Sequence, residues 1–148
     1  MGAMSVFLEK IESSNIAEIY QNVDSVWNER RDKFNQAMID KKLPLRAANM
    51  SSVWSLYYTE PSRYNWMLQY YLRSEGLALS WVGTGRLIFS LNYSDADFVE
   101  VLNRFVNACE RMKVDQWFWA PPELTNQKIK RGIFKEMFFS KKQSAVLN

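Results

Sequence analysis

Apolar residues in the first quarter of the chain recur at helical spacing. They stand three, four or seven positions apart from Ile16 to Met38, and the other members are Ile19, Tyr20, Val23, Trp27 and Phe34. This spacing places them on one face of a long amphipathic helix. Ser14 suits the N-cap position, and Pro44 follows where the pattern stops. The segment therefore predicts a helix that begins near Ser14 and ends before Pro44.

Two strands are predicted after this helix. Val53–Tyr58 alternates Trp54, Leu56 and Tyr58 with Val53, Ser55 and Tyr57, which is the period of a pleated strand. Leu45–Asn49 is a shorter candidate strand, and Asn49–Ser52 is a plausible turn between the two.

The next segment predicts a helix and two more strands. The helix starts at Pro61-Ser62 and ends at Gly76, a residue suited to a helix C-terminus. Its apolar stripe consists of Tyr64, Met67, Leu68, Tyr71 and Leu72. A short strand over 77–80, a turn at Gly83-Thr84-Gly85 and a strand over 86–93 are expected to follow.

Two helices complete the pattern. Ser94 is placed to cap the first, with Asp95 and Asp97 in the turn where the helix dipole favours anions. Its buried face is predicted to hold Phe98, Val101, Leu102, Phe105, Cys109 and Met112. After Trp117-Phe118-Trp119 and the helix-breaking Pro121-Pro122, a last helix over 125–139 gathers Ile129, Ile133, Met137 and Phe138 opposite its basic residues.

This order of elements predicts an α+β fold, a two-layer sandwich with helices on one face of a small antiparallel or mixed sheet. A length of 148 residues suits one domain. We interpret residues 1–4 as a remnant of cloning, 5–112 as the domain, and 113–148 as a C-terminal extension with a basic amphipathic helix.

Composition excludes several kinds of chemistry. Histidine is absent, which removes Ser-His and Cys-His catalysis and histidine-based zinc sites. The single Cys109 cannot form an internal disulfide and is expected to be inert core. The lysines stand in charged stretches, whereas a Schiff-base lysine needs desolvation. With no signal peptide and no apolar run long enough for a membrane span, a cytoplasmic protein is expected.

The candidate site residues are few. Gly83-Thr84-Gly85 opens a strand instead of a helix, so we interpret it as a plain turn and not a dinucleotide loop. Asp95, Asp97 and Glu100 share one helical turn and could divide acid and base roles, but capping explains the first two. Arg86 begins a strand whose partner segment carries Trp81. A guanidinium there can bind a carboxylate through two hydrogen bonds, and an ordinary surface or ion-paired arginine is the alternative.

The basic tail also has two interpretations. Aromatic residues followed by the cluster from Lys128 to Lys142 could bind nucleic acid or a membrane surface. The simpler prediction, which we favour, is an amphipathic helix docked on the domain with a solvated cationic face. A net charge of +3 does not by itself imply nucleic acid, so neither nucleic acid nor a membrane is expected as a partner.

Three motifs resemble the C-terminal small domain of class III aminotransferases, the pyridoxal-phosphate enzymes that include glutamate-1-semialdehyde 2,1-aminomutase. SSVWSLYY is similar to a strand of that domain, LRSEGLALS to a helix end that runs into a short strand, and RLIFSLNYSDADF to the strand and helix start that follow. The resemblance covers roughly residues 43–112. Ser51-Ser52 at the strand entry and Phe89-Ser90 after the arginine depart from the family pattern.

The resemblance implies a fragment of a transferase or isomerase. In many members the arginine that matches Arg86 binds the substrate carboxylate, although relatives of the aminomutase often lack it. Arg86 and Trp81 are therefore the expected substrate-binding residues, with no catalytic residue in this chain. A missing N-terminal large domain would bind pyridoxal phosphate, the fragment alone would bind none and be inactive, and the intact enzyme would be a homodimer. The alternative is a stand-alone α+β protein-binding module without enzymatic activity.

Overall fold

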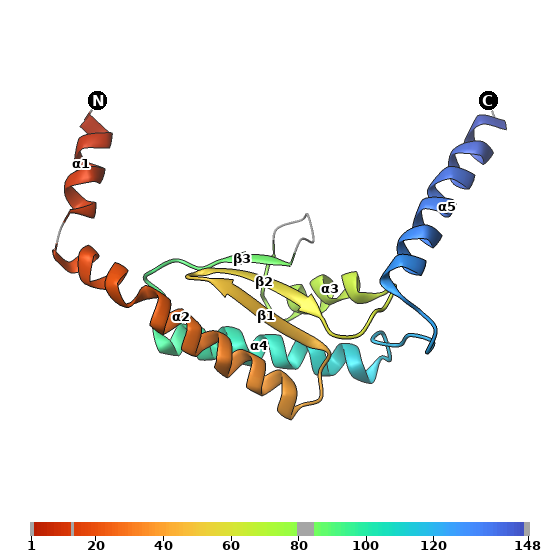
Figure 1. Cartoon of the computed structure of the whole chain (residues 1–148), viewed down its shortest axis with the longest axis horizontal. Coiled ribbons are helices and arrows are strands. Elements are labelled where there is room, and N and C mark those ends of the chain that lie inside the picture. Colours follow the sequence, from red (N-terminus) through yellow and green to blue (C-terminus); the bar gives the residue numbers. More distant parts are fainter. Residues whose placement is uncertain (1, 13, 80–84, 147–148) are drawn as a thin grey trace.

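Two long helices lie on one face of a three-stranded sheet (Figure 1). The structure is a computed structural model that describes residues 2–12, 14–79 and 85–146. In chain order its elements are α1 (Gly2–Ile11), α2 (Ser14–Asp40), β1 (Leu45–Met50), β2 (Val53–Tyr58), a 3₁₀ turn η1 (Asn65–Met67), α3 (Leu68–Ser74), β3 (Arg86–Ile88), α4 (Asp95–Val114) and α5 (Asn126–Val146).

The sheet has the order β1-β2-β3, and both strand pairs are antiparallel. Met50 pairs with Val53, so β1 and β2 form a tight hairpin with two residues in its loop. Ser51 in this loop has a φ of 52°, the left-handed conformation that such loops require. The predicted α+β fold with helices on one face of a small sheet is confirmed, and its sheet is antiparallel throughout the described residues.

The core forms where α2 and α4 meet the sheet. Trp54 of β2 is 1% exposed and lies at the centre of a group of aromatic rings. Its ring centroid is 5.2 Å from that of Phe89, 5.7 Å from that of Phe34, 6.0 Å from that of Phe98 and 6.1 Å from that of Trp27. Edge-to-face contacts of this kind add to the free energy gained by burying the rings. Trp54 therefore joins all the layers.

The predicted start of α2, the predicted end of α3 and the predicted start of α4 agree with the structure. α2 begins at Ser14, and Gly76 follows α3 with a φ of +83°. Ser94 and Asp97 form a reciprocal capping box at the start of α4, in which each side chain accepts a hydrogen bond from the other residue's backbone N–H. Of the predicted buried face of α4, Phe98, Phe105, Cys109 and Met112 are buried, whereas Val101 and Leu102 are partly buried against the core. Ala108, which was not predicted, is also buried.

The prediction that α3 starts at Pro61-Ser62 is wrong. The chain turns there, with the Ser62 hydroxyl accepting a hydrogen bond from the Tyr64 N–H. The same hydroxyl lies within hydrogen-bonding distance of the carbonyls of Trp117 and Trp119. Serine can thus satisfy backbone groups outside a helix, which delays helix formation until Asn65.

Two predicted strands are also corrected. Residues 77–79 have no regular structure, and the Leu77 N–H bonds to the Leu72 carbonyl at the end of α3 instead of joining a ladder. Ser80 lies outside the described residues. The strand predicted over 86–93 ends at Ile88, because the Ser90 carbonyl and hydroxyl accept hydrogen bonds from the N–H groups of Tyr93 and Asn92 in a turn.

The last helix does not dock on the domain as predicted. α5 projects from one end of the molecule, and α1 projects from the other (Figure 1). One ion pair, between Arg63 and Glu136, links α5 to the segment before α3. Phe134, Met137 and Phe138 are each at least 60% exposed. The helix is amphipathic, as its sequence indicates, but its apolar residues are largely uncovered.

Replacing Trp54 by alanine is expected to lower the free energy of unfolding by about 3–5 kcal/mol, because it opens a cavity between the helices and the sheet. Urea denaturation followed by circular dichroism measures this change. Trp66 is the matched control, since it is 55% exposed and its replacement by alanine is expected to change stability by no more than about 0.5 kcal/mol. Equal effects for the two variants would contradict the assignment of Trp54 to the centre of the core.

Candidate functional site

Among the residues that the structure describes, no helix packs against the second face of the sheet. Strand residues alternate between the two faces, and cross-strand partners share a face. Because Trp54 and its partner Leu87 face the helices, the partners Ser55 and Arg86 face the other way. The same alternation places these further residues on the uncovered face: Arg46, Ala48, Met50, Val53, Tyr57 and Ile88. Met50 and Ile88 are 78% and 74% exposed, so this face is partly apolar and open.

Arg86 is the charged residue of β3 on this face. Its side chain is exposed and has no ion-pair partner among the described residues. Gly85, directly before it, has a φ of +66° and lies so close to β2 that a Cβ there would be 2.7 Å from the Leu56 carbonyl oxygen. This glycine lets β3 approach β2 closely, and so it fixes the position of Arg86 at the start of β3.

A second arginine on the same face is already engaged. Arg46 of β1 donates hydrogen bonds from Nη1 to the carbonyl oxygens of Leu43 and Leu45, at 2.8 and 2.6 Å. Its guanidinium therefore closes the turn between α2 and β1. Arg86 makes no side-chain hydrogen bond within the described part of the chain, so its whole guanidinium is available for a ligand, whereas Arg46 has one nitrogen engaged.

Two hydroxyl groups stand close to Arg86 in the sheet. Ser55 is its direct cross-strand partner, and Tyr57 follows on the same face of β2. Directly opposed Cβ atoms in an antiparallel pair lie about 4.5–5.5 Å apart. A carboxylate held by Arg86 through two hydrogen bonds could therefore also accept one from Ser55. The sequence analysis missed Ser55, although the alternation in Val53–Tyr58 together with the pairing to Arg86 would have identified it.

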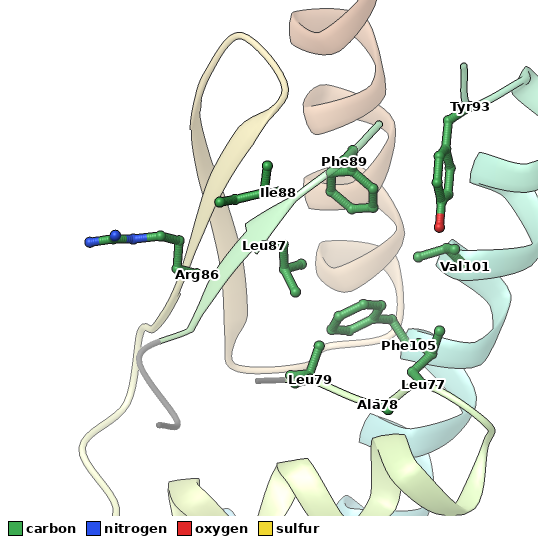
Figure 2. A pocket seen from close by; sticks show the side chains of 10 residues that line it. All are labelled: Leu77, Ala78, Leu79, Arg86, Leu87, Ile88, Phe89, Tyr93, Val101 and Phe105. Atoms are coloured by element: carbon green, nitrogen blue, oxygen red, sulfur yellow. The ribbon is translucent and has the colours of Figure 1, made fainter. Parts of the chain in front are cut away.

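A cavity of about 570 Å³ lies on the other side of β3, between that strand, residues 77–79 and α4. Figure 2 shows Leu87, Phe89 and Phe105 around this space, whereas the Arg86 side chain points away from it. The lining is mainly aliphatic and aromatic. Residues 77–79, for which a strand was predicted, line one side of the cavity without joining the sheet, and Arg86 and Ile88 border it at β3.

The other predicted candidates have structural roles or fall outside the structure. Trp81 and Gly83-Thr84 lie outside the described residues. Glu100 bonds to Arg104 on the next turn of α4, and Asp97 serves the capping box. Asp95 bonds to Arg30. The capping interpretation is therefore confirmed for Asp97, whereas Asp95 is explained by its ion pair with Arg30 of α2.

Arg30 is a buried charge that the sequence analysis did not identify. It is 6% exposed, and its Nη2 donates hydrogen bonds to Asp95 and to the Tyr93 carbonyl, both at 2.9 Å. The guanidinium also lies 4.6 Å from the centre of the Trp27 ring. Arg30 thus fastens α2 to the loop between β3 and α4, and it holds the pKa of Asp95 below its ordinary value.

The described residues contain no activated nucleophile. Cys109 is fully buried, and burial raises the pKa of its thiol to about 12. Lysine side chains are exposed wherever the structure describes them, so none is desolvated as a Schiff-base lysine must be. The described part of the chain also has no group of side chains suited to a metal ion, and none of its helices is both long and apolar enough to cross a membrane.

Comparison with known proteins gives a structural match. No family model and no curated protein matches the chain. Among solved structures, the chain is similar to one described as a transaminase with pyridoxal phosphate bound. The TM-score is 0.57 with 12% sequence identity, and the match covers 72% of this chain.

The chain spans 26% of the length of that transaminase. At this level of identity the likeness shows the fold alone: an α+β unit with a small antiparallel sheet, consistent with a transaminase C-terminal domain. The exposed lysines do not suit a cofactor-carrying role. The described residues of this chain therefore do not fit the binding of pyridoxal phosphate by themselves.

The loop between β3 and α4 is expected to give a measurable pH dependence. Hydrogen bonds from the Ser94 hydroxyl and backbone hold the pKa of Asp97 below its ordinary value. Because the pKa of Asp97 is lower in the folded state than in the unfolded state, its ionised side chain stabilises the fold. This stabilisation is fully present above the unfolded-state pKa and is lost as the pH falls through the folded-state pKa. Ser94→Ala is therefore expected to lower stability by about 1 kcal/mol at pH 7, and by less near pH 2.

Urea denaturation of both proteins across this pH range tests the expectation. Thr59→Ala, at an exposed position just after β2, is the control and should leave stability nearly unchanged at every pH. A Ser94→Ala effect that stayed constant down to pH 2 would show that the charge on Asp97 is not involved.

Proposed function

We propose that this chain is the C-terminal small domain of a class III pyridoxal-phosphate-dependent aminotransferase or aminomutase. It forms one wall of the substrate site, and a larger part of the protein holds the cofactor. Two observations support the proposal. The fold is shared with about a quarter of a transaminase, and an available arginine stands on a sheet face that no helix covers.

The positions of the three family-like motifs favour class III. SSVWSLYY forms the hairpin loop and β2, and LRSEGLALS runs from the end of α3 into residues 77–79. RLIFSLNYSDADF contains β3 and the capped start of α4. The segments that carry the resemblance thus surround Arg86. We further propose a cytoplasmic, homodimeric intact enzyme.

The residues of this chain would bind and orient the substrate. Arg86 holds a substrate carboxylate through two hydrogen bonds, and Ser55 donates a third. The apolar residues Val53 and Ile88, which are paired on the same face, exclude water once the larger part of the protein covers them. Pyridoxal phosphate, when bound by that larger part, supplies the electron sink for the reaction.

The proposal predicts where the cofactor binds. Pyridoxal phosphate added to this chain is expected to leave its absorbance spectrum that of the free cofactor. A version extended upstream in frame is expected to show the red-shifted band of the lysine-bound cofactor. Borohydride reduction followed by peptide mass spectrometry should then locate the cofactor on a lysine outside these 148 residues.

If the extended protein stays colourless, the aminotransferase proposal fails. The alternative, a stand-alone protein-binding module that uses the uncovered sheet face, would then be favoured. Attachment of the cofactor to a lysine of this chain would contradict the assignment of the cofactor site to the larger part.

In the extended protein, Arg86→Ala is expected to raise KM for a carboxylate substrate about 10- to 100-fold, because hydrogen bonds to a charged group are lost. The effect on kcat should be small if the carboxylate is held equally in the ground state and the transition state. Steady-state kinetics with the carboxylate substrate and its amide analogue measures this change, and the variant should discriminate less between the two. Arg73→Ala, an exposed arginine at the end of α3, is the control. An unchanged KM in Arg86→Ala would remove Arg86 from the substrate site.

A further inference from the structure

The N-terminal part of the chain presents an uncovered apolar stripe with an acidic edge. We refer to residues 5–12 and 14–24, which lie in α1, the residue after it and the start of α2, as the N-terminal arm. In α1 the spacing of three and four puts Phe7, Leu8 and Ile11 on one helix face, and they are 58%, 51% and 37% exposed. Glu12 follows at the edge of this stripe, whereas Glu9 lies by helical spacing on the far side of α1, where it accepts a hydrogen bond from the Ser5 hydroxyl. The arm contains four acidic residues and one lysine, so it carries an excess of negative charge.

The C-terminal helix α5 also has an exposed apolar stripe, but the charged residues around it are mainly basic. We refer to residues 126–138 of α5 as the C-terminal arm. Ile133, Phe134, Met137 and Phe138 share one side of the helix and are 41%, 62%, 60% and 71% exposed. Four exposed basic residues accompany them: Lys128, Lys130, Arg131 and Lys135. The one acid of the arm, Glu136, is paired with Arg63. The arm is therefore an apolar stripe with an unbalanced positive charge.

The two arms do not meet within one molecule. They stand at the two ends of its longest axis, with the sheet, α3 and α4 between them, and both rise from the same side of the body (Figure 1). The two apolar stripes, which carry opposite charges, therefore cannot contact each other within one molecule.

We propose that the N-terminal arm of one copy of this chain packs against the C-terminal arm of a second copy. Because a two-fold axis makes every such contact twice, one dimer buries both arms of both copies. The apolar stripes supply the buried area, Glu12 can pair with Arg131 at the edge, and the acidic excess of one arm attracts the basic excess of the other. A single short helix pair would be smaller than most stable interfaces, so the doubling is needed.

This inference uses neither Arg86 nor the uncovered sheet face, and it does not rest on the proposed function. An anionic membrane is the other surface that a basic amphipathic helix can bind. The second copy is favoured because the N-terminal arm of the chain itself offers an apolar stripe with an acidic excess, which complements the basic C-terminal arm.

Charge reversal of each arm tests the proposal. Sedimentation equilibrium of the 148-residue chain is expected to give twice the mass of 17.5 kDa, with weaker association at high salt. Glu9→Lys with Glu12→Lys makes both arms basic, and Arg131→Glu with Lys135→Glu removes the positive excess of the C-terminal arm. Each double variant alone should dissociate at least about tenfold more readily. An equimolar mixture of the two should form a mixed dimer again, because each reversed arm then meets an arm of opposite charge.

Recovery in the mixture excludes misfolding as the cause of the loss. Met50→Ser with Ile88→Ser, on the uncovered sheet face, is the control and should leave the dimer intact. A monomeric wild-type chain overturns the proposal, as do variants that stay dimeric or a mixture that does not recover. Binding of the monomer to phosphatidylserine vesicles, lost in the Arg131→Glu, Lys135→Glu variant, would instead assign the C-terminal arm to lipid. Cofactor binding by the extended protein is a separate measurement, so its failure would not be confused with any of these results.

Discussion

The packing of α2 and α4 against the sheet is centred on the buried indole of Trp54. Its ring contacts aromatic residues of α2, α4 and the end of β3, so a single side chain of the central strand joins both layers. The indole Nε1 has no hydrogen-bond partner among the described residues, which costs free energy that the burial of the ring must offset. Since a strand alternates its side chains, fixing Trp54 toward the helices also fixes Ser55 on the other face.

The antiparallel register carries this constraint to β3. Leu87 pairs with Trp54 and therefore turns toward the helices and the cavity of about 570 Å³, while Arg86 pairs with Ser55 and turns outward. A slip of one residue would bury the guanidinium in an apolar cavity, where an unpaired charge is very costly. Gly85 helps to prevent this slip because only a residue without a Cβ fits against the Leu56 carbonyl. The position of the candidate site is thus a consequence of core packing.

The helices at the two ends of the molecule, α1 and α5, have exposed apolar residues. The apolar residues of α1 and α5 cannot reach the sheet, whose helix-covered face is already filled by α2 and α4. Exposed stripes of this size are unusual for a protein that acts alone. The free face of the sheet and the two arms are therefore the surfaces on which the two proposals rest. The arms differ in charge, whereas the sheet face combines an arginine with apolar side chains.

Local patterns in the chain predict α2, α4, the β1–β2 hairpin and the capped start of α4, because these depend on periodicity and on hydrogen bonds between neighbouring residues. The sequence by itself also identified Arg86 as the candidate arginine. It did not determine the extent of β3 or the course of residues 77–79, since strands form only where a partner strand completes the ladder. The availability of Arg86, the engagement of Arg46 and the placement of Ser55 beside Arg86 were decided by the tertiary structure. Each of these features depends on contacts between residues far apart in the chain. The exposure of the apolar residues of α5 also depends on the tertiary structure, because α5 does not pack on the core.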